Sequence, residues 1–203
     1  MNTTTRKEIQ EQRMKAYFLQ ATKDILKSEG LRSVSVRNIA EKAGYSFATM
    51  YNYFKDAKEL IFLCVKDFQD ECALHVQERT AKSGRGARKL KAIMLAYADY
   101  FVQYPGIFEL CFIEKLSDIS GKQKIADYIV SFPDRLCEEE WQYCLQKELV
   151  NKKDIEKIKL QLRTITSGAL LLYLNRNSPV SYPEFTQMLG MQLDNTLALL
   201  TNK

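Results

Sequence analysis

Apolar side chains recur every three or four residues along most of this chain, a spacing typical of amphipathic α-helices. The first such stripe, within residues 9–28, comprises Tyr17, Phe18, Ala21, Ile25 and Leu26. Glycine and proline, which interrupt helices, number only 8 and 4 among 203 residues. No segment reads convincingly as a strand, and none carries the roughly 18 uninterrupted apolar residues of a membrane-spanning helix. The chain is therefore expected to be all-α.

About nine helices are expected in two domains, a DNA-binding domain at residues 1–66 and a regulatory domain at 67–203. The predicted ranges are 9–28, 36–43, 46–53, 56–79, 90–104, 107–116, 122–147 with an interruption or kink near Pro133, 154–175 and 182–200. Asp56 and Glu59 have the spacing of a capping box. Ala81–Ala87, with two glycines, is the best candidate linker.

Charge is distributed unevenly between these domains. Residues 1–66 contain 12 lysines and arginines against 7 acids, which accounts for the whole formal charge of +5. A basic excess of this size suggests a polyanionic partner, although a solvated basic surface would look the same.

Few residues have the chemistry that an enzyme needs. The five cysteines lie in apolar or helical runs without a CxxC pair, so they are expected to be small buried side chains in a reducing cytoplasm. His75 is the only histidine, which leaves little scope for a metal site or a catalytic triad. Glu138 and Glu140 read as a solvated helix face. We therefore expect no enzyme activity, metal or cofactor.

Residues 35–54 have the pattern of a helix-turn-helix. Ala40 is small where a second helix must lie close, and Gly44 can adopt the positive φ of a tight turn. Ser46 can cap the following helix and leave its N-terminus facing outward. A helical hairpin inside an ordinary core would share the helix–glycine–helix pattern. The side chains around the second helix are therefore needed to distinguish a DNA-binding motif from such a hairpin.

Those side chains favour DNA. Met50 and Phe54 are spaced to pack inward, whereas Phe47, Ala48 and Thr49 occupy the first turn, where a recognition helix meets base edges. Tyr51, Asn52, Tyr53 and Lys55 supply phosphate donors around it.

The segment from Tyr17 to Leu60 resembles the TetR/AcrR family of bacterial transcriptional regulators. The matching residues lie mainly in SVRNIAEKAGYSFATMYNYF (35–54) and KDAKEL (55–60), and they are Ser35, Ile39, Ala40, Ala43, Gly44, Ser46, Tyr51, Phe54, Lys58, Glu59 and Leu60. Phe47 and Ala48 depart from the family pattern, which has small or polar residues and glycine there. These departures leave the fold unaffected but make the operator sequence uncertain.

The resemblance implies a set of DNA contacts. They are Arg6, Ser35, Arg37, Ser46, Phe47, Ala48, Thr49, Tyr51, Asn52, Tyr53, Lys55 and Lys58. Arg6 and Lys7 are expected to form a basic N-terminal arm that reaches the neighbouring minor groove. It also implies a homodimer on a palindromic operator. The stripes Ile155, Ile158, Leu162, Ile165, Ala169 and Leu172, and Leu189, Leu193, Leu197 and Leu200, are expected to form the dimer face; a monomeric core is the alternative.

Family members also bind a small molecule in the larger domain. Aromatic residues expected to line such a pocket are Tyr97, Phe101, Tyr104, Phe108, Phe112, Tyr128, Phe132, Trp141 and Tyr173, each of which could instead be core. They would suit a mainly apolar or aromatic effector. The expected function is that of a cytoplasmic, ligand-responsive repressor. A cysteine-dependent enzyme and a helical module with an acidic protein partner are the alternatives.

Overall fold

The computed structural model describes residues 6–113, 122–175 and 178–200, without the side chains of 122–125 and 199. Every regular element in these ranges is helical, which confirms the all-α prediction. The chain divides into two units, residues 1–69 with 104–125, and residues 70–103 with 126–203. We describe each unit separately.

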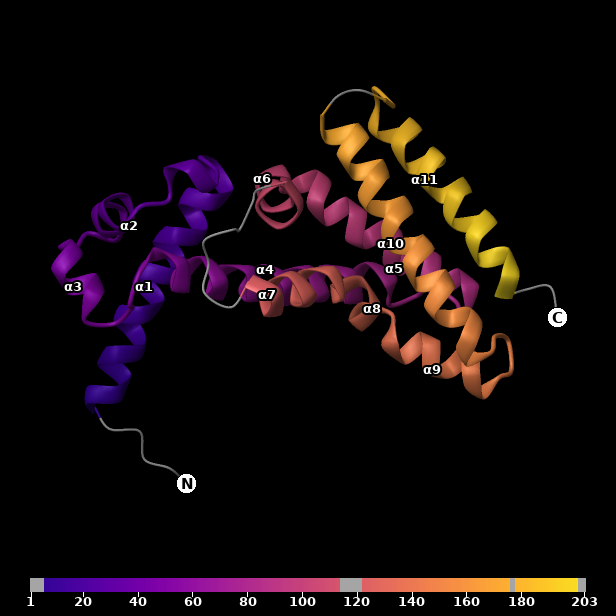
Figure 1. Cartoon of the computed structure of the whole chain (residues 1–203), viewed down its shortest axis with the longest axis horizontal. Helices are drawn as coiled ribbons and strands as arrows, with labels where there is room; N and C mark the ends of the chain where they lie inside the picture. Colours follow the sequence, from indigo (N-terminus) through magenta and orange to yellow (C-terminus); the bar gives the residue numbers. More distant parts are fainter. Residues whose placement is uncertain (1–5, 114–121, 176–177, 201–203) are drawn as a thin grey trace. The chain divides into compact units, whose positions relative to one another are not determined.

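The N-terminal unit is built around α1 (Arg6–Ser28), against which α2 packs (Figure 1). Its further elements are the short 3₁₀ turn η1 (Leu31–Ser33), α2 (Val36–Ala43), α3 (Phe47–Tyr51), the first half of α4 (Ala57–Thr80), α6 (Pro105–Phe108) and the π-helical turn η2 (Glu109–Ile113). The predicted helix 107–116 is therefore an α-turn followed by a π-turn, and residues 114–116 lie outside the described residues.

The core of this unit consists of buried side chains from all four of its main helices. They are Phe18, Ile25, Ile39, Met50, Phe54 and Leu60. The Phe18 ring lies 5.7 Å from Tyr45, 6.3 Å from Tyr53 and 6.2 Å from Phe54, centroid to centroid. Tyr17 was predicted to belong to the same buried stripe, and that prediction is wrong: its side chain is 54% exposed. A neighbour of Phe18 in sequence points about 100° away from it around the helix.

A segment from the middle of the chain completes the N-terminal unit. At Gly106 an added Cβ would lie 3.0 Å from the carbonyl oxygen of Leu26, so α6 approaches the end of α1 more closely than most side chains allow. The ammonium of Lys27 lies 5.1 Å from the centre of the Tyr104 ring and 5.3 Å from that of Phe68. This unit therefore includes residues well beyond the predicted 1–66.

The C-terminal unit is a set of longer helices in which α5 and α11 pack together and both contact α10 (Figure 1). Its helices are α5 (Ala87–Gln103), α7 (Lys122–Val130), α8 (Phe132–Leu136), α9 (Glu138–Gln146), α10 (Lys152–Leu174), α11 (Tyr182–Leu197) and the 3₁₀ turn η3 (Ala198–Leu200). Trp141, Tyr97 and Phe185 are among its largest fully buried side chains.

The helix predicted at 122–147, interrupted or kinked near Pro133, is divided in the structure into α7, α8 and α9. Pro133 has no N–H to donate and lies in the first turn of α8, where that loss costs nothing. Cys137 then ends α8 and begins α9. A kink was expected at the proline, but the second break had no sequence signal.

Two carboxylates cross-link this unit over long sequence separations. Asp99 on α5, only 12% exposed, accepts hydrogen bonds from His75 (Nε2, 3.0 Å), Gln103 (Nε2, 2.8 Å) and Tyr182 (Oη, 2.5 Å), and pairs with Arg79 (3.2 Å). Buried Glu140 accepts from the backbone N–H of Gly86 and pairs with Arg85 at 3.1 Å.

Candidate nucleic-acid interface and effector pocket

Two caps and one glycine form the corner between α2 and α3. The Ser35 hydroxyl accepts from the N–H of Asn38 (3.1 Å), and the Ser46 hydroxyl accepts from the N–H of Thr49 (3.1 Å). Gly44 has φ 76° and ψ 26°, the left-handed conformation that side chains disfavour. These are the positions at which the sequence predicted the start and end of α2 and the start of α3.

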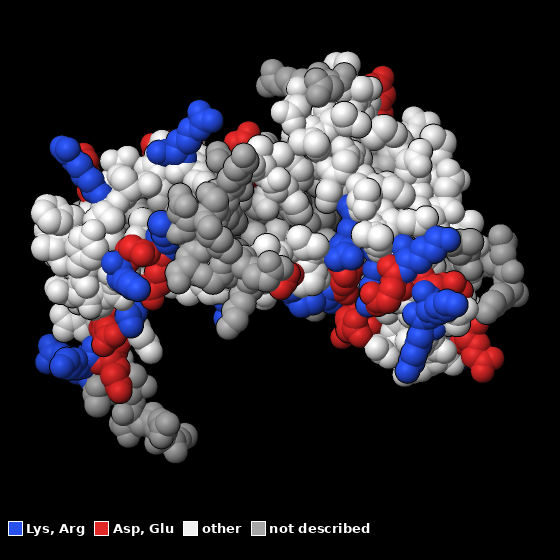
Figure 2. Space-filling view, viewed as in Figure 1, with Lys and Arg blue, Asp and Glu red and all other residues white. Residues whose placement is uncertain are grey.

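The outer face of α3 is exposed and uncharged. Phe47 and Tyr51 are 63% and 54% exposed, whereas Met50 on the opposite face is fully buried. The five residues of α3, FATMY, carry no charge, and the surface at this position is white in Figure 2. Such a face can meet base edges through apolar and hydroxyl contacts, including the thymine methyl group.

The predicted DNA contacts fall into two groups by exposure. Thr49 and Tyr53 are half-buried; the Thr49 hydroxyl lies 2.9 Å from that of Ser46, and the Tyr53 ring leans on Phe18. The exposed group contains Arg6, Ser35, Arg37, Ser46, Phe47, Ala48, Tyr51, Asn52, Lys55 and Lys58. The helix ends at Tyr51 rather than the predicted Tyr53, so Asn52 is its C-cap.

The start of α4 lies directly after this corner and is also capped. Asp56 accepts from the N–H of Glu59 (2.9 Å), but the Glu59 carboxylate accepts from Lys55 (2.8 Å) rather than from Asp56. The predicted capping box is therefore shifted by one residue on one side. The hydrogen bond to Glu59 fixes the backbone at Lys55, and the side chain of Lys58 is exposed in the first turn of α4.

Sequence reasoning missed one exposed aromatic residue beside α3. Tyr45, which lies between Gly44 and Ser46, is 39% exposed and was interpreted only as part of a helix break. A hydroxyl-bearing ring immediately before a recognition-helix cap was the available signal.

The predicted pocket aromatics do not form one cluster. Tyr104, Phe108 and Phe112 belong to the N-terminal unit, and the others belong to the C-terminal unit. Among the latter, Tyr97, Phe101, Phe132 and Trp141 are buried, with Tyr97 5.0 Å from Phe101 and 6.0 Å from Phe132. Tyr128 lies under Arg135 (4.2 Å) and Tyr173 stacks on Phe185 (4.5 Å).

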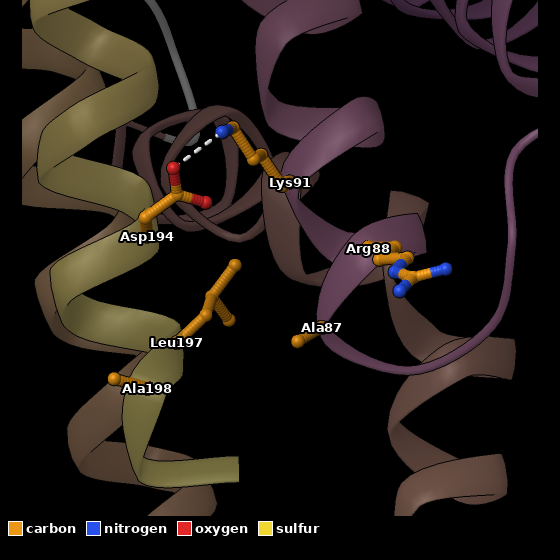
Figure 3. Close-up of a pocket in the computed structure, with 6 residues that line it drawn as sticks. All are labelled: Ala87, Arg88, Lys91, Asp194, Leu197 and Ala198. Carbon is orange, nitrogen blue, oxygen red and sulfur yellow. Dashed lines mark hydrogen bonds and ion pairs between the residues drawn. The ribbon is translucent and has the colours of Figure 1, made fainter. Parts of the chain in front are cut away.

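The cavities of the C-terminal unit include two with the volume of a small-molecule site that we describe by their lining. One, about 470 Å³, is lined by Thr80, Arg85, Lys89, Ile93 and Glu140 among others. The second, about 380 Å³, lies between α5 and α11 (Figure 3). There Lys91 reaches to Asp194 at 2.5 Å, Leu197 points into the gap and Arg88 points away. None of the predicted aromatics lines either cavity.

Several buried polar atoms of this unit have no hydrogen-bond partner among the described residues. They are Nε1 of Trp141, Oε1 of Gln161, Nε of Arg163 and Oγ1 of Thr166. Buried polar groups are normally paired, so each atom is available to an acceptor or donor that enters the core. Among the predicted aromatic residues, Trp141 therefore has a buried N–H that an effector could accept from.

The predicted dimer stripes on α10 and α11 are mostly internal to one protomer. Ile155, Ile158, Leu162, Ala169, Leu189, Leu193, Leu197 and Leu200 are all buried within the C-terminal unit. The prediction is wrong for these residues because α5, α10 and α11 use the same stripes to pack on one another. The apolar residues that these two helices expose are instead Leu160, Leu171, Leu172 and Met191.

Within the described ranges, no helix is long and apolar enough to cross a bilayer. The sequence model for bacterial regulatory proteins of the tetR family matches residues 18–64. No curated protein matches the chain significantly.

Solved structures share the fold of nearly the whole chain. A TetR family regulator from Marinobacter aquaeolei VT8 is 17% identical with a TM-score of 0.66, covering 94% of this chain and 97% of its own. The regulator FadR from Bacillus subtilis, solved with stearoyl-CoA, is 12% identical with a TM-score of 0.71, covering 90% and 97%. A tetR-family regulator from Streptomyces coelicolor is 16% identical with a TM-score of 0.65, covering 93% and 80%. Residues 18–64 thus match the tetR family of bacterial regulatory proteins, and nearly the whole chain has the fold of solved regulators of that family.

Proposed function

We propose that the protein is a homodimeric cytoplasmic repressor that binds a palindromic operator through α3 and releases it when a small, mainly apolar effector binds. The observation that carries this proposal is the exposed, uncharged face of α3, held over buried Met50 by the caps at Ser35 and Ser46. An α-helix fits the major groove, which is about 12 Å wide, and its first turn reaches the base edges. Phe47 and Ala48 then contact bases, and Tyr51, Lys55 and Lys58 contact phosphates.

A dimer supplies the second recognition helix. Two such helices must lie about 34 Å apart to read half-sites one helical turn apart. The exposed side chains Leu160, Leu171, Leu172 and Met191 offer an apolar face on α10 and α11 for the partner copy. Burial of that face on association explains why long leucines remain at the surface of these two helices.

The proposed effector is apolar with at least one hydrogen-bonding group. Trp141 and Tyr97 supply buried aromatic surface, and the indole N–H of Trp141 is free to donate to a ligand oxygen within the described part of the core. The FadR structure contains stearoyl-CoA, a long apolar chain with a polar head. An acyl chain is accordingly one class of effector to test first.

Release follows from linkage between the two binding events. Residues of α4 contribute to both units. A change in this helix that follows effector binding can therefore alter the positions of the recognition helices. A ligand that binds one arrangement more tightly shifts the population toward it. A coupling of about 1–3 kcal/mol weakens DNA binding roughly 5- to 150-fold.

The test is selection of bound sequences from random duplex DNA by the full-length protein. We expect enrichment of a palindrome that Tyr51→Ala and Lys58→Ala weaken. Lys153→Ala, an exposed lysine on α10, is the matched control and should leave binding unchanged. Failure of a folded dimer to enrich any sequence at moderate salt would contradict DNA recognition and favour an acidic protein partner.

A further inference from the structure

We propose that Tyr17 and Tyr45 form a phosphate-binding pair beside the recognition helix, in which the two phenol hydroxyls donate hydrogen bonds to the DNA backbone. This site is separate from the contacts that the helix-turn-helix motif implies. It rests on the proposed DNA binding, and it adds a second anchoring point from α1.

The two rings form one exposed platform. Their centroids lie 6.1 Å apart with 36° between the ring planes, and they are 54% and 39% exposed. The ring of Tyr45 is held in place because it also packs on the fully buried ring of Phe18, with the two ring centroids 5.7 Å apart. A hydroxyl carried on a ring that is held in this way loses little freedom on binding a ligand.

Neither hydroxyl has a hydrogen-bond partner within the described residues, and nothing in the packing of the unit requires one. Covering Phe18 would need only the rings, and phenylalanine would do that equally well. Two tyrosines here present hydroxyl donors to solvent in a unit whose neighbouring surface is proposed to bind a polyanion. Hydroxyl groups of tyrosine are common donors to DNA phosphates.

The position of the pair matches that of a phosphate backbone. Tyr45 immediately precedes Ser46, the cap of α3. When the first turn of α3 lies in a groove about 12 Å wide, the strands that bound the groove lie within roughly 6–10 Å of it. Tyr45 adjoins the start of α3 in the chain and Tyr17 of α1 lies beside it, so the pair is placed to meet one of these strands.

Arg13 adds a charge to the same face of α1. It precedes Tyr17 by four residues, which places it one helical turn away, and its side chain is exposed. The two tyrosine hydroxyls and the Arg13 guanidinium can then bind successive phosphates of one strand. The two kinds of contact differ in their response to salt.

The test is a comparison of Tyr17→Phe, Tyr45→Phe and the double variant by fluorescence anisotropy, using the selected operator and a scrambled duplex from 50 to 200 mM salt. Each single variant should weaken binding to both duplexes about three- to tenfold, because a charge-assisted hydrogen bond is lost while the ring stays. The slope of log K against log salt should not change, since a neutral hydroxyl displaces no counterion. Arg13→Gln should reduce that slope by about 0.9 for each phosphate it neutralises.

Tyr104→Phe is the matched control. It is an exposed tyrosine of the same unit, packed on Lys27, which lies ten residues or about 15 Å along α1 from Tyr17. It should bind both duplexes as the wild type does. Wild-type affinity in both Tyr17→Phe and Tyr45→Phe, or equal losses in Tyr104→Phe, would overturn the phosphate pair while leaving DNA binding intact. A wild type that binds neither duplex would overturn both proposals.

Discussion

The helix-turn-helix corner and the core of the C-terminal unit are fixed by contacts of different range along the sequence. At the corner the contacts that place the helices span few residues: Ser35 to Asn38, Ser46 to Thr49, and Asp56 to Glu59. In the C-terminal unit they span many, as in Asp99 with Tyr182 and Lys91 with Asp194. The comparison indicates that the local caps define where α3 begins, whereas the shape of the regulatory core depends on pairs that no local pattern reveals.

The largest effect should come from Phe18→Ala, which removes a fully buried ring that contacts three other aromatic rings. We expect a loss of about 3–5 kcal/mol in the free energy of unfolding of the N-terminal unit. Trp141, the only tryptophan, is buried in the other unit and reports on it alone. Circular dichroism should show early partial melting while Trp141 fluorescence keeps its wild-type midpoint; a parallel drop would mean that the units unfold together.

Asp99→Asn tests the long-range pairs. The amide keeps the shape but loses the charge that Arg79 pairs with, and it presents N–H groups to donors from His75 and Tyr182. We expect a loss of about 2–3 kcal/mol, read from Trp141 fluorescence in denaturant. Asp194→Asn, whose carboxylate is 60% exposed and pairs with Lys91, should cost no more than about 1 kcal/mol. Equal losses of stability in Asp99→Asn and Asp194→Asn would show that the long-range contacts of Asp99 contribute no more than an exposed ion pair.

Gly44→Ala and Gly168→Ala form a matched pair, because an added Cβ meets no atom within 4 Å at either site. Gly44 has φ 76°, so alanine there should cost about 1–2 kcal/mol and weaken DNA binding. Gly168 lies inside α10, where alanine should stabilise by about 0.5–1 kcal/mol. Thermal unfolding by circular dichroism measures both, and stabilisation at Gly44 would contradict the assigned turn.

The smallest effect concerns alkaline pH. Burial, followed by the hydrogen bond to Asp99, raises the pKa of Tyr182 from 10.0 to about 12. The folded state therefore holds this proton more tightly than the unfolded state, so the stabilisation is complete below pH 10 and is lost as pH rises toward 12. Wild type should lose more stability than Tyr182→Phe across that window, measured by denaturant titration at fixed pH. Identical pH profiles would show that the hydroxyl contributes nothing.

Most of the helical pattern was predictable from sequence, and so was the helix-turn-helix corner, because caps, glycine and apolar spacing act within one turn of helix. Tyr17 was misplaced because a stripe of aromatics does not reveal which of two neighbours faces inward. The break at Cys137 lacks any local signal, and the leucines of α10 and α11 could not be divided between core and surface without knowing that α5 packs on both. The sequence also could not show that Tyr104 and Phe108 belong to a different unit from the other predicted pocket aromatics, because that division depends on long-range packing.

The Gly106 contact with α1 has a consequence for synthesis. Residues 104–125 complete the N-terminal unit, although α1 to α3 are translated long before them. At about 5–20 residues per second, the interval between residues 69 and 125 is roughly 3–11 s. Throughout that time the nascent chain on the ribosome carries an unfinished DNA-reading unit with the end of α1 uncovered. Chaperones that bind emerging chains can therefore reach the uncovered end of α1 before the N-terminal unit is complete.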